Sequence, residues 1–152
     1  MRNWMVAALT TVLVAGSVAY AQDEKEKKIA MADVPAPVQK AIKDHAKGAT
    51  VRGVSTEMDS GKRVYEAELR LNGKTRDITF DENGGVVSAE EETAIDQIPA
   101  AARAAIEKAA AGGKLRLVET VTEHGQTSYE GHFNKGGRES EIKVDAEGRP
   151  VK

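Results

Sequence analysis

The sequence predicts an α+β protein made of two tandem α-β-β-β-β units, each with one helix packed on an antiparallel four-stranded sheet. The first observation is an internal repeat: a shift of 64 residues aligns residues 97–152 with residues 33–88 without a gap, and about 17 of 56 positions are identical. The second is that each unit opens with apolar residues at helical spacing. The third is that each unit continues with period-two alternation interrupted by glycine turns.

The N-terminal residues have the pattern of a targeting segment. Arg2 precedes a mostly apolar run, and Ala19-Tyr20-Ala21 is a cleavage signature, so we interpret residues 1–21 as a secretory signal peptide cut after Ala21. The apolar run is too short to anchor the chain comfortably in a bilayer, and no other run is long enough for a membrane span. We therefore expect a periplasmic or secreted protein. The charged residues 22–32 lack an apolar period and are predicted to form a flexible leader.

Composition excludes several classes. The 152 residues include no cysteine, which rules out disulfides and lipid attachment through a cysteine. The 22 basic and 24 acidic residues are interspersed and give a formal net charge of −2. This balance is typical of a solubility surface and not of a nucleic-acid interface.

The first unit, residues 33–88, is predicted to begin with a helix. Asp33-Val34-Pro35 provides a cap and a proline in the first turn, and Gly48 provides the stop. The apolar stripe of this helix is Val38, Ala41, Ile42 and Ala46.

The second unit, residues 97–152, repeats the helix signal after a linker at residues 89–96. Its helix opens at Pro99 and ends at Gly112-Gly113. The corresponding stripe is Ala102, Ala105, Ile106 and Ala109. Because it is rich in alanine, this helix should form readily and pack close to its sheet.

Four strands are predicted after each helix. In the clearest strand, apolar residues from Tyr65 to Leu71 alternate with Glu66, Glu68 and Arg70, which indicates one buried and one solvated face. The matching strand of the second unit places Glu130, His132 and Asn134 on its polar face. A short last strand is expected at residues 86–87 and at residues 150–151, each after a turn of the form Asp-x-x-Gly.

This order of elements resembles the PepSY-like domains of exported bacterial proteins, which are grouped with the beta-lactamase-inhibitor-like fold. The shared signals are a Pro at the helix start, a Tyr-Glu strand, a glycine hairpin and an Ile-x-(Phe/Val)-Asp-x-x-Gly segment. They are Pro35, Tyr65, Glu66, Gly73, Ile78, Phe80, Asp81 and Gly84 in the first unit, and Pro99, Tyr129, Glu130, Gly137, Ile142, Val144, Asp145 and Gly148 in the second. The resemblance implies an exported, non-enzymatic module, often duplicated, that binds a ligand or inhibits a partner enzyme.

No catalytic constellation is present in the sequence. The Gly-x-Ser-x-Gly elbow and a phosphate-binding glycine loop are both absent. Glu130, His132 and Glu141 can converge on neighbouring strands, but the equivalent positions of the first unit hold Glu66, Glu68 and Asp77. We therefore interpret this face as solvated, assign no metal ligand or cofactor, and do not expect an enzyme.

The predicted function is a non-catalytic binding or regulatory module that contacts an envelope protein or peptide through the sheet face or its edge. The predicted binding residues are Glu66, Glu68, Arg70, Glu130, His132 and Asn134. Two alternatives stay open at this stage. One is a divalent-cation-binding envelope protein that uses the same carboxylates and His132. The other is an inhibitor of a secreted protease or beta-lactamase, although the four aromatic residues after position 21 all fall in the apolar phase of predicted strands.

Overall fold

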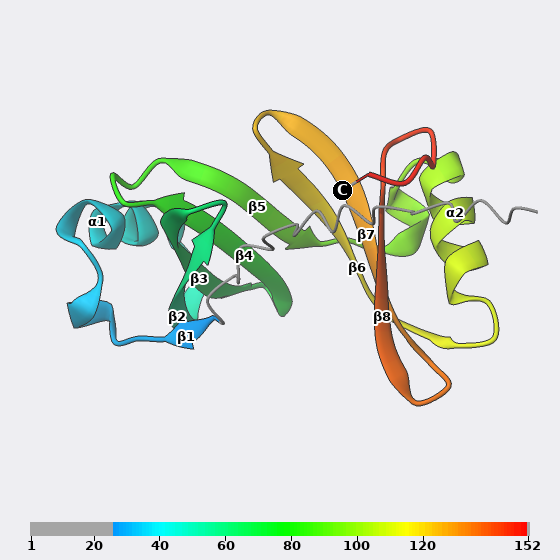
Figure 1. Ribbon diagram of the computed structural model, residues 1–152, viewed down its shortest axis with the longest axis horizontal. Coiled ribbons are helices and arrows are strands. Elements are labelled where there is room, and N and C mark those ends of the chain that lie inside the picture. The colour runs from blue at the N-terminus through cyan, green and yellow to red at the C-terminus, as the bar shows by residue number, and fades with distance from the viewer. Residues whose placement is uncertain (1–25, 152) are drawn as a thin grey trace, which may run out of the picture.

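In the computed structural model, the described residues 26–151 form one antiparallel sheet of eight strands, arranged in chain order, with two helices (Figure 1). The helices are α1 (Ala36–His45) and α2 (Ala100–Ala110), and each follows a short 3-10 turn, η1 (Met31–Asp33) or η2 (Ile95–Gln97). The strands are β1 (Lys27–Lys28), β2 (Thr50–Asp59), β3 (Lys62–Leu71), β4 (Lys74–Asp81), β5 (Val86–Glu92), β6 (Lys114–Glu123), β7 (Gln126–Lys135) and β8 (Arg138–Val144). The predicted signal peptide, residues 1–21, lies outside the described residues.

The α+β class is confirmed, but the two units share a sheet instead of each having its own. Strand β5 extends to Glu92 and so includes the first half of the predicted linker at residues 89–96. It pairs antiparallel with β6, with Ala89 opposite Thr122 and Glu91 opposite Thr120. The physical reason is that an unpaired β5 would expose a row of backbone N–H and C=O groups, and β6 satisfies them.

The second unit contributes three strands, not the predicted four. At residues 150–151 the structure has only an isolated bridge between Val144 and Pro150. The Val151 amide donates to the Lys143 carbonyl over 3.0 Å. Proline has no N–H to donate to a ladder, which explains why a regular strand does not form at this position.

Part of the predicted leader is ordered. Lys27 and Lys28 form β1 and pair with Thr56 and Ser55 of β2. Ile29 and Met31, just after β1, pack against the core of the first unit. Residues 27–31 therefore belong to the fold of the first unit, although the sequence predicts a flexible leader over residues 22–32.

The two units have the same backbone geometry at equivalent positions. The turn between β2 and β3 has positive φ at Ser60 and Gly61, 48° and 78°, and the turn between β6 and β7 has 49° and 76° at His124 and Gly125. Each first strand also carries a register shift, between Val51 and Gly53 in β2 and between Leu115 and Leu117 in β6. The two turns match because two successive positive φ values suit the right-handed twist of a two-residue hairpin.

Both helices lie on the same face of the sheet. Val38 and Ile42 of α1 pack with Ala67, Ile78 and Phe80, and all five are fully buried. In the second unit, Ala102 and Ile106 of α2 pack with Val118 and Val144. The cross-strand register runs from Ala67 through Ile78 and Ala89 to Thr122, which lies on the same side of β6 as Val118. Within residues 26–151, the opposite face of the sheet therefore carries no helix, and we call it the helix-free face.

The start of α1 differs from the prediction in one detail. Pro35 is the N-cap residue, and no side chain caps the first turn. Asp33, the predicted cap, lies in η1. The Gln39 side chain instead donates to the Val34 carbonyl over 2.9 Å, from within the helix.

The Asp-x-x-Gly segments are structural turns that contact the helices. In the first unit, the Asp81 carboxylate accepts hydrogen bonds from the amides of Asn83 and Gly85, both at 2.8 Å. A Cβ at Gly84 would lie 2.8 Å from the Pro37 carbonyl oxygen of α1. Glycine is required here because its φ is +82° and the helix backbone is so close.

Candidate functional site on the helix-free face

The helix-free face carries a row of carboxylates that crosses most of the sheet. We call these residues the acidic face. They are Glu66 and Glu68 of β3, Asp77 of β4, Glu90 of β5, Glu119 of β6, Glu130 of β7 and Glu141 of β8.

The structure places the six predicted binding residues on this face but in two separate groups. Glu66, Glu68 and Arg70 lie along β3, and the other three lie along β7. Strands β4, β5 and β6 separate the groups. With strands about 4.8 Å apart, the groups are roughly 19 Å from each other. They are therefore not one compact site.

Three further carboxylates fill the space between these groups. Asp77 lies opposite Glu68 on one side and opposite Glu90 on the other. In the second unit, Glu119 lies opposite Glu130. Like charges directly opposite each other destabilise a sheet, so the face has an energetic cost that a cation would relieve.

Sequence reasoning recognised Asp77 as acidic but missed Glu90 and Glu119 as part of the surface. Glu90 was expected in a linker, and its strand pairing depends on the shared sheet. Glu119 follows the register shift at Arg116. This shift changes which residues of β6 face the helices and which face the opposite side of the sheet. The one sequence signal for this register shift was the repeat, because the equivalent positions 52 and 116 both hold arginine.

Burial favours the protonated form of these carboxyl groups. Desolvation, reinforced by repulsion from Asp77, raises the pKa of Glu66 to about 7. Desolvation and repulsion from Glu68 raise the pKa of Asp77 to about 6. Burial also raises the pKa values of Glu90, Glu119 and Glu130.

Basic residues neutralise only part of this charge. The Lys28 ammonium lies 3.4 Å from a Glu68 oxygen. The Lys143 ammonium lies 3.5 Å from an oxygen of Glu123, which is not one of the acidic-face residues. A hollow of about 540 Å³ opens over β3 and β4, and its charged lining is four acidic and two basic residues: Glu26, Glu66, Glu68, Asp77, Arg52 and Arg70.

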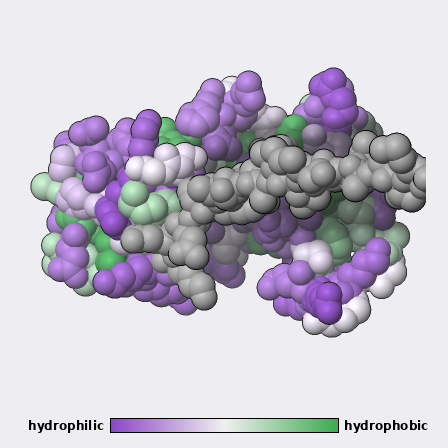
Figure 2. Space-filling view, viewed as in Figure 1, coloured by the Kyte–Doolittle hydropathy of each residue, from purple (hydrophilic) through white to green (hydrophobic). Residues whose placement is uncertain are grey.

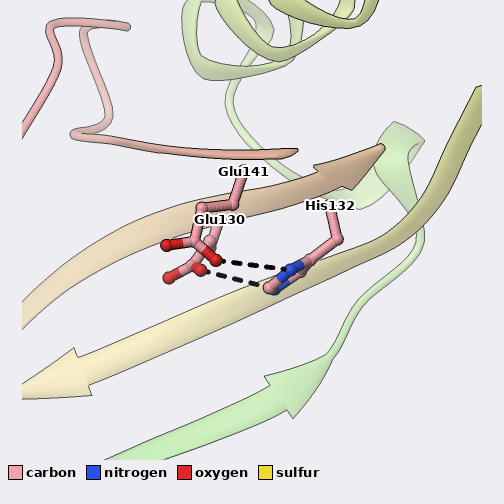
Figure 3. Close-up of side chains that lie close together, drawn as sticks. All are labelled: Glu130, His132 and Glu141. Atoms are coloured by element: carbon pink, nitrogen blue, oxygen red, sulfur yellow. Dashed lines mark ion pairs between the residues drawn. The ribbon is translucent and has the colours of Figure 1, made fainter. Parts of the chain in front are cut away.

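At the β7 end of the face, His132 is surrounded by glutamates. Its Nε2 atom is 3.1 Å from Glu119 Oε2 and 3.3 Å from Glu130 Oε1. Its Nδ1 atom is 3.8 Å from Glu141 Oε2. Figure 3 shows the carboxylates of Glu130 and Glu141 side by side and directed at the imidazole ring. The predicted convergence of Glu130, His132 and Glu141 is therefore present in the structure.

The exposed surface offers few apolar anchors. Hydrophilic residues cover most of the view in Figure 2, with only small hydrophobic patches between them. Among the described residues, the large hydrophobic side chains that are well exposed are Val51, Val86 and Val151. The surface therefore favours recognition by charge and hydrogen bonds over recognition by aromatic or aliphatic anchors.

A comparison with protein families identifies one segment directly. Residues 99–148 match the family model described as "Peptidase propeptide and YPEB domain", or PepSY. This segment is therefore similar to the PepSY domain. This match begins at Pro99, just before α2, and covers β6, β7, β8 and the Asp-x-x-Gly turn. The predicted PepSY resemblance is thus confirmed, while the interpretation of residues 33–88 as a second copy stays a prediction.

Solved structures of three Bacteroides proteins share the fold of this chain. A Bacteroides eggerthii protein described as periplasmic has 21% identity and a TM-score of 0.62, over 78% of this chain and 86% of the other. A DUF2874 family protein from Bacteroides uniformis has 23% identity and a TM-score of 0.60, with the same coverage. A BLIP-like protein from Bacteroides fragilis has 19% identity and a TM-score of 0.55, over 78% and 84%. At these identities the likeness establishes the fold.

A search of curated proteins returns no match. Within residues 26–151, neither helix has the length and apolar character needed to cross a membrane.

Proposed function

We propose that this protein is an exported, non-catalytic binding module whose acidic face receives a positively charged segment of an envelope protein or peptide. Export is supported by the signal-peptide pattern of residues 1–21 and by the likeness to a protein described as periplasmic. A non-catalytic role is supported by the PepSY match and by the lack of a recognisable catalytic motif in the sequence.

The observation that carries the proposal is the cross-strand stacking of carboxylates. Glu68, Asp77 and Glu90 lie opposite one another on three successive strands. Burial is the main cause of the raised pKa values of Asp77 and Glu90, and solvent screens a buried charge less than an exposed one. A lysine or arginine side chain placed between them would gain charge-assisted hydrogen bonds and remove the repulsion.

The extended shape of the face suits an extended partner. The row of carboxylates runs perpendicular to the strands, so a peptide that follows it would meet one acidic residue per strand. The β8 edge, apart from the bridge between Val144 and Pro150, is another place where a peptide could bind, through backbone pairing. We favour the face because its charges specify the chemistry of the partner, whereas the edge does not.

The test is a titration of the ¹⁵N-labelled chain with a lysine-rich 12-residue peptide, followed by NMR at low and at high salt. We expect amide shifts on β3, β4 and β5 and weaker binding at high salt. Neutralising four carboxylates (E66Q, E68Q, D77N and E90Q) should abolish the shifts. A control with the same change in charge at exposed positions outside the face should keep them: D33N, E82Q, D96N and E107Q.

Equal binding by the face variant and the control would show that the acidic face is not the site. Shifts confined to β8 would assign the contact to the sheet edge and overturn the face proposal. The same two variants, used as baits for an envelope extract, would then identify natural partners that depend on the face.

A further inference from the structure

His132 is enclosed by glutamates from three neighbouring strands. Glu119 comes from β6, Glu130 from β7 and Glu141 from β8. One ligand atom each from Glu130, His132 and Glu141 lies within 4.8 Å of the other two. In Figure 3, the carboxylates of Glu130 and Glu141 lie on the same side of the His132 ring.

A buried carboxylate, Glu119, also contacts the imidazole, at the same ring nitrogen as Glu130. The Glu119 side chain is only 5% exposed, and its Oε2 atom is 3.1 Å from Nε2 of His132. When Nε2 carries the ring proton, it donates to Glu119, and Nδ1 has a free lone pair on the side of Glu141. A histidine that binds a metal usually donates its second ring N–H to such a carboxylate, so this pair points to Nδ1 as a ligand.

We propose that Glu130, His132 and Glu141 form a site for a divalent transition-metal ion of the Zn²⁺ type, with Nδ1 of His132 as the nitrogen ligand. Glu119 is the positioning residue that fixes the ring. The site goes beyond the proposed peptide contact, because it takes a different ligand at the β7–β8 end of the sheet.

The geometry requires side-chain rotations at both carboxylate ligands, and the Glu130 oxygen that lies 3.3 Å from Nε2 must turn toward Nδ1. Zinc bonds to imidazole nitrogen and carboxylate oxygen are about 2.0–2.2 Å, which places neighbouring ligand atoms of a tetrahedral ion roughly 3.3 Å apart. The Nδ1 atom of His132 and the Oε2 atom of Glu141 are 3.8 Å apart, and the Glu141 side chain is 68% exposed and free to move. Lys143 lies opposite Glu130, but its ammonium lies against Glu123.

The ligand chemistry selects the class of ion. Calcium takes six to eight oxygen ligands, and magnesium keeps most of its water. One imidazole with two carboxylates suits zinc and related ions better, and leaves a coordination position for water.

The first unit provides an internal control. At the positions equivalent to Glu130, His132 and Glu141 it has Glu66, Glu68 and Asp77, with no nitrogen ligand. At the position of Glu119 it has Ser55, which is 2% exposed. The buried carboxylate therefore occurs only in the unit that has the histidine, as expected if the two residues act together.

The test is isothermal titration of Zn²⁺, Ca²⁺ and Mg²⁺ into the full chain without a polyhistidine tag. We expect one Zn²⁺ per chain, with Ca²⁺ and Mg²⁺ at least tenfold weaker. H132Q should weaken Zn²⁺ binding at least tenfold, while the matched variant E68Q in the first unit should bind as the wild type does. E119Q should cost 10- to 100-fold in affinity. In ¹⁵N NMR of the imidazole, Zn²⁺ should shift the Nδ1 resonance of His132.

Several results would overturn the proposal. These are equal Zn²⁺ affinity in the wild type and H132Q, Ca²⁺ binding as tight as Zn²⁺ binding, or Zn²⁺ binding without a change at His132 Nδ1. H45Q and H124Q, at the other two histidines, should leave the affinity unchanged. No peptide is present in this titration, so its outcome is independent of the peptide experiment.

Discussion

Ile106 of α2 occupies the space that a side chain at position 131 of β7 would need. A Cβ built on Gly131 would lie 2.4 Å from Ile106 Cγ2. In the first unit the equivalent pair is Ile42 and Ala67, both fully buried, so the methyl group is accommodated there. The two units thus fill the same helix–sheet contact with different pairs of residues.

We expect G131A to destabilise the protein by about 1–3 kcal/mol, because the added methyl group overpacks the contact with Ile106. Urea unfolding followed by circular dichroism would measure the change. In an I106A background the same substitution should cost less, since the clashing methyl is gone. A cost of G131A that is the same in both backgrounds would show that the contact with Ile106 is not the cause.

A second pair of substitutions distinguishes the cost of a left-handed backbone conformation from the cost of a steric clash with helix α1. Gly84 and Gly61 have similar φ values, +82° and +78°. A Cβ at Gly84 would meet the Pro37 carbonyl at 2.8 Å, whereas a Cβ at Gly61 has no neighbour within 4 Å. G61A should cost about 1 kcal/mol of unfolding free energy for the left-handed conformation alone. G84A should cost clearly more, and equal costs in urea unfolding would disprove the role of the helix contact.

Glu66 should make stability depend on pH. Its pKa is raised from 4.5 to about 7 in the folded state, so the folded protein retains this proton where the unfolded chain has lost it. The stability therefore falls as the pH rises from about 4.5 to 7, and the loss is complete above that range. Because Glu66 is partly exposed, we expect E66Q to be more stable than the wild type by only about 1 kcal/mol at pH 8.

The matched control for this prediction is E82Q, at an exposed turn position. Neither variant should differ much from the wild type at pH 4, where Glu66 is protonated in both states. Urea unfolding at pH 4, 6 and 8 would check the trend. A stabilising effect of E66Q that is as large at pH 4 as at pH 8 would contradict the assignment to ionisation.

The shared sheet should make the two units unfold together. Val121 of β6 is fully buried on the helix-free face and lies opposite Glu90 of β5, the strand that joins the units. V121A should lower the stability by about 1–3 kcal/mol. Followed residue by residue in urea by NMR, amides of β3 and β7 should lose their folded signals over the same denaturant range. A V121A protein in which β3 survives well after β7 has unfolded would show that the β5–β6 pairing does not couple the units.

Local patterns in the sequence predicted most of the helices, strands and turns. The alternation from Tyr65 to Leu71 gave the correct inward and outward faces of β3, because period-two burial is set within one strand. The positive φ values at Gly61 and Gly125 also follow from local turn chemistry. These features depend on neighbouring residues, which is why a single sequence is enough to find them.

Features that depend on distant pairing were harder to predict. The acidic residues at 90–92 have no strand signal of their own, and they form β5 because β4 and β6 flank them. Glu119 acquires its place beside His132 only after the register shift at Arg116 and the pairing of β6 with β7. The predicted binding residues therefore included His132 but not the buried carboxylate that the structure places next to it.

The strict agreement between strand order and chain order has a consequence for how the protein is made. Each strand after β1 pairs with the strand that precedes it in the chain, so no later segment must insert between strands already formed. The core of the first unit is complete within residues 29–89. If the chain is exported N-terminus first, as proposed above, it can bury that core before α2 and β8 have crossed the membrane. Strand β6 can then pair with β5, which is already in place.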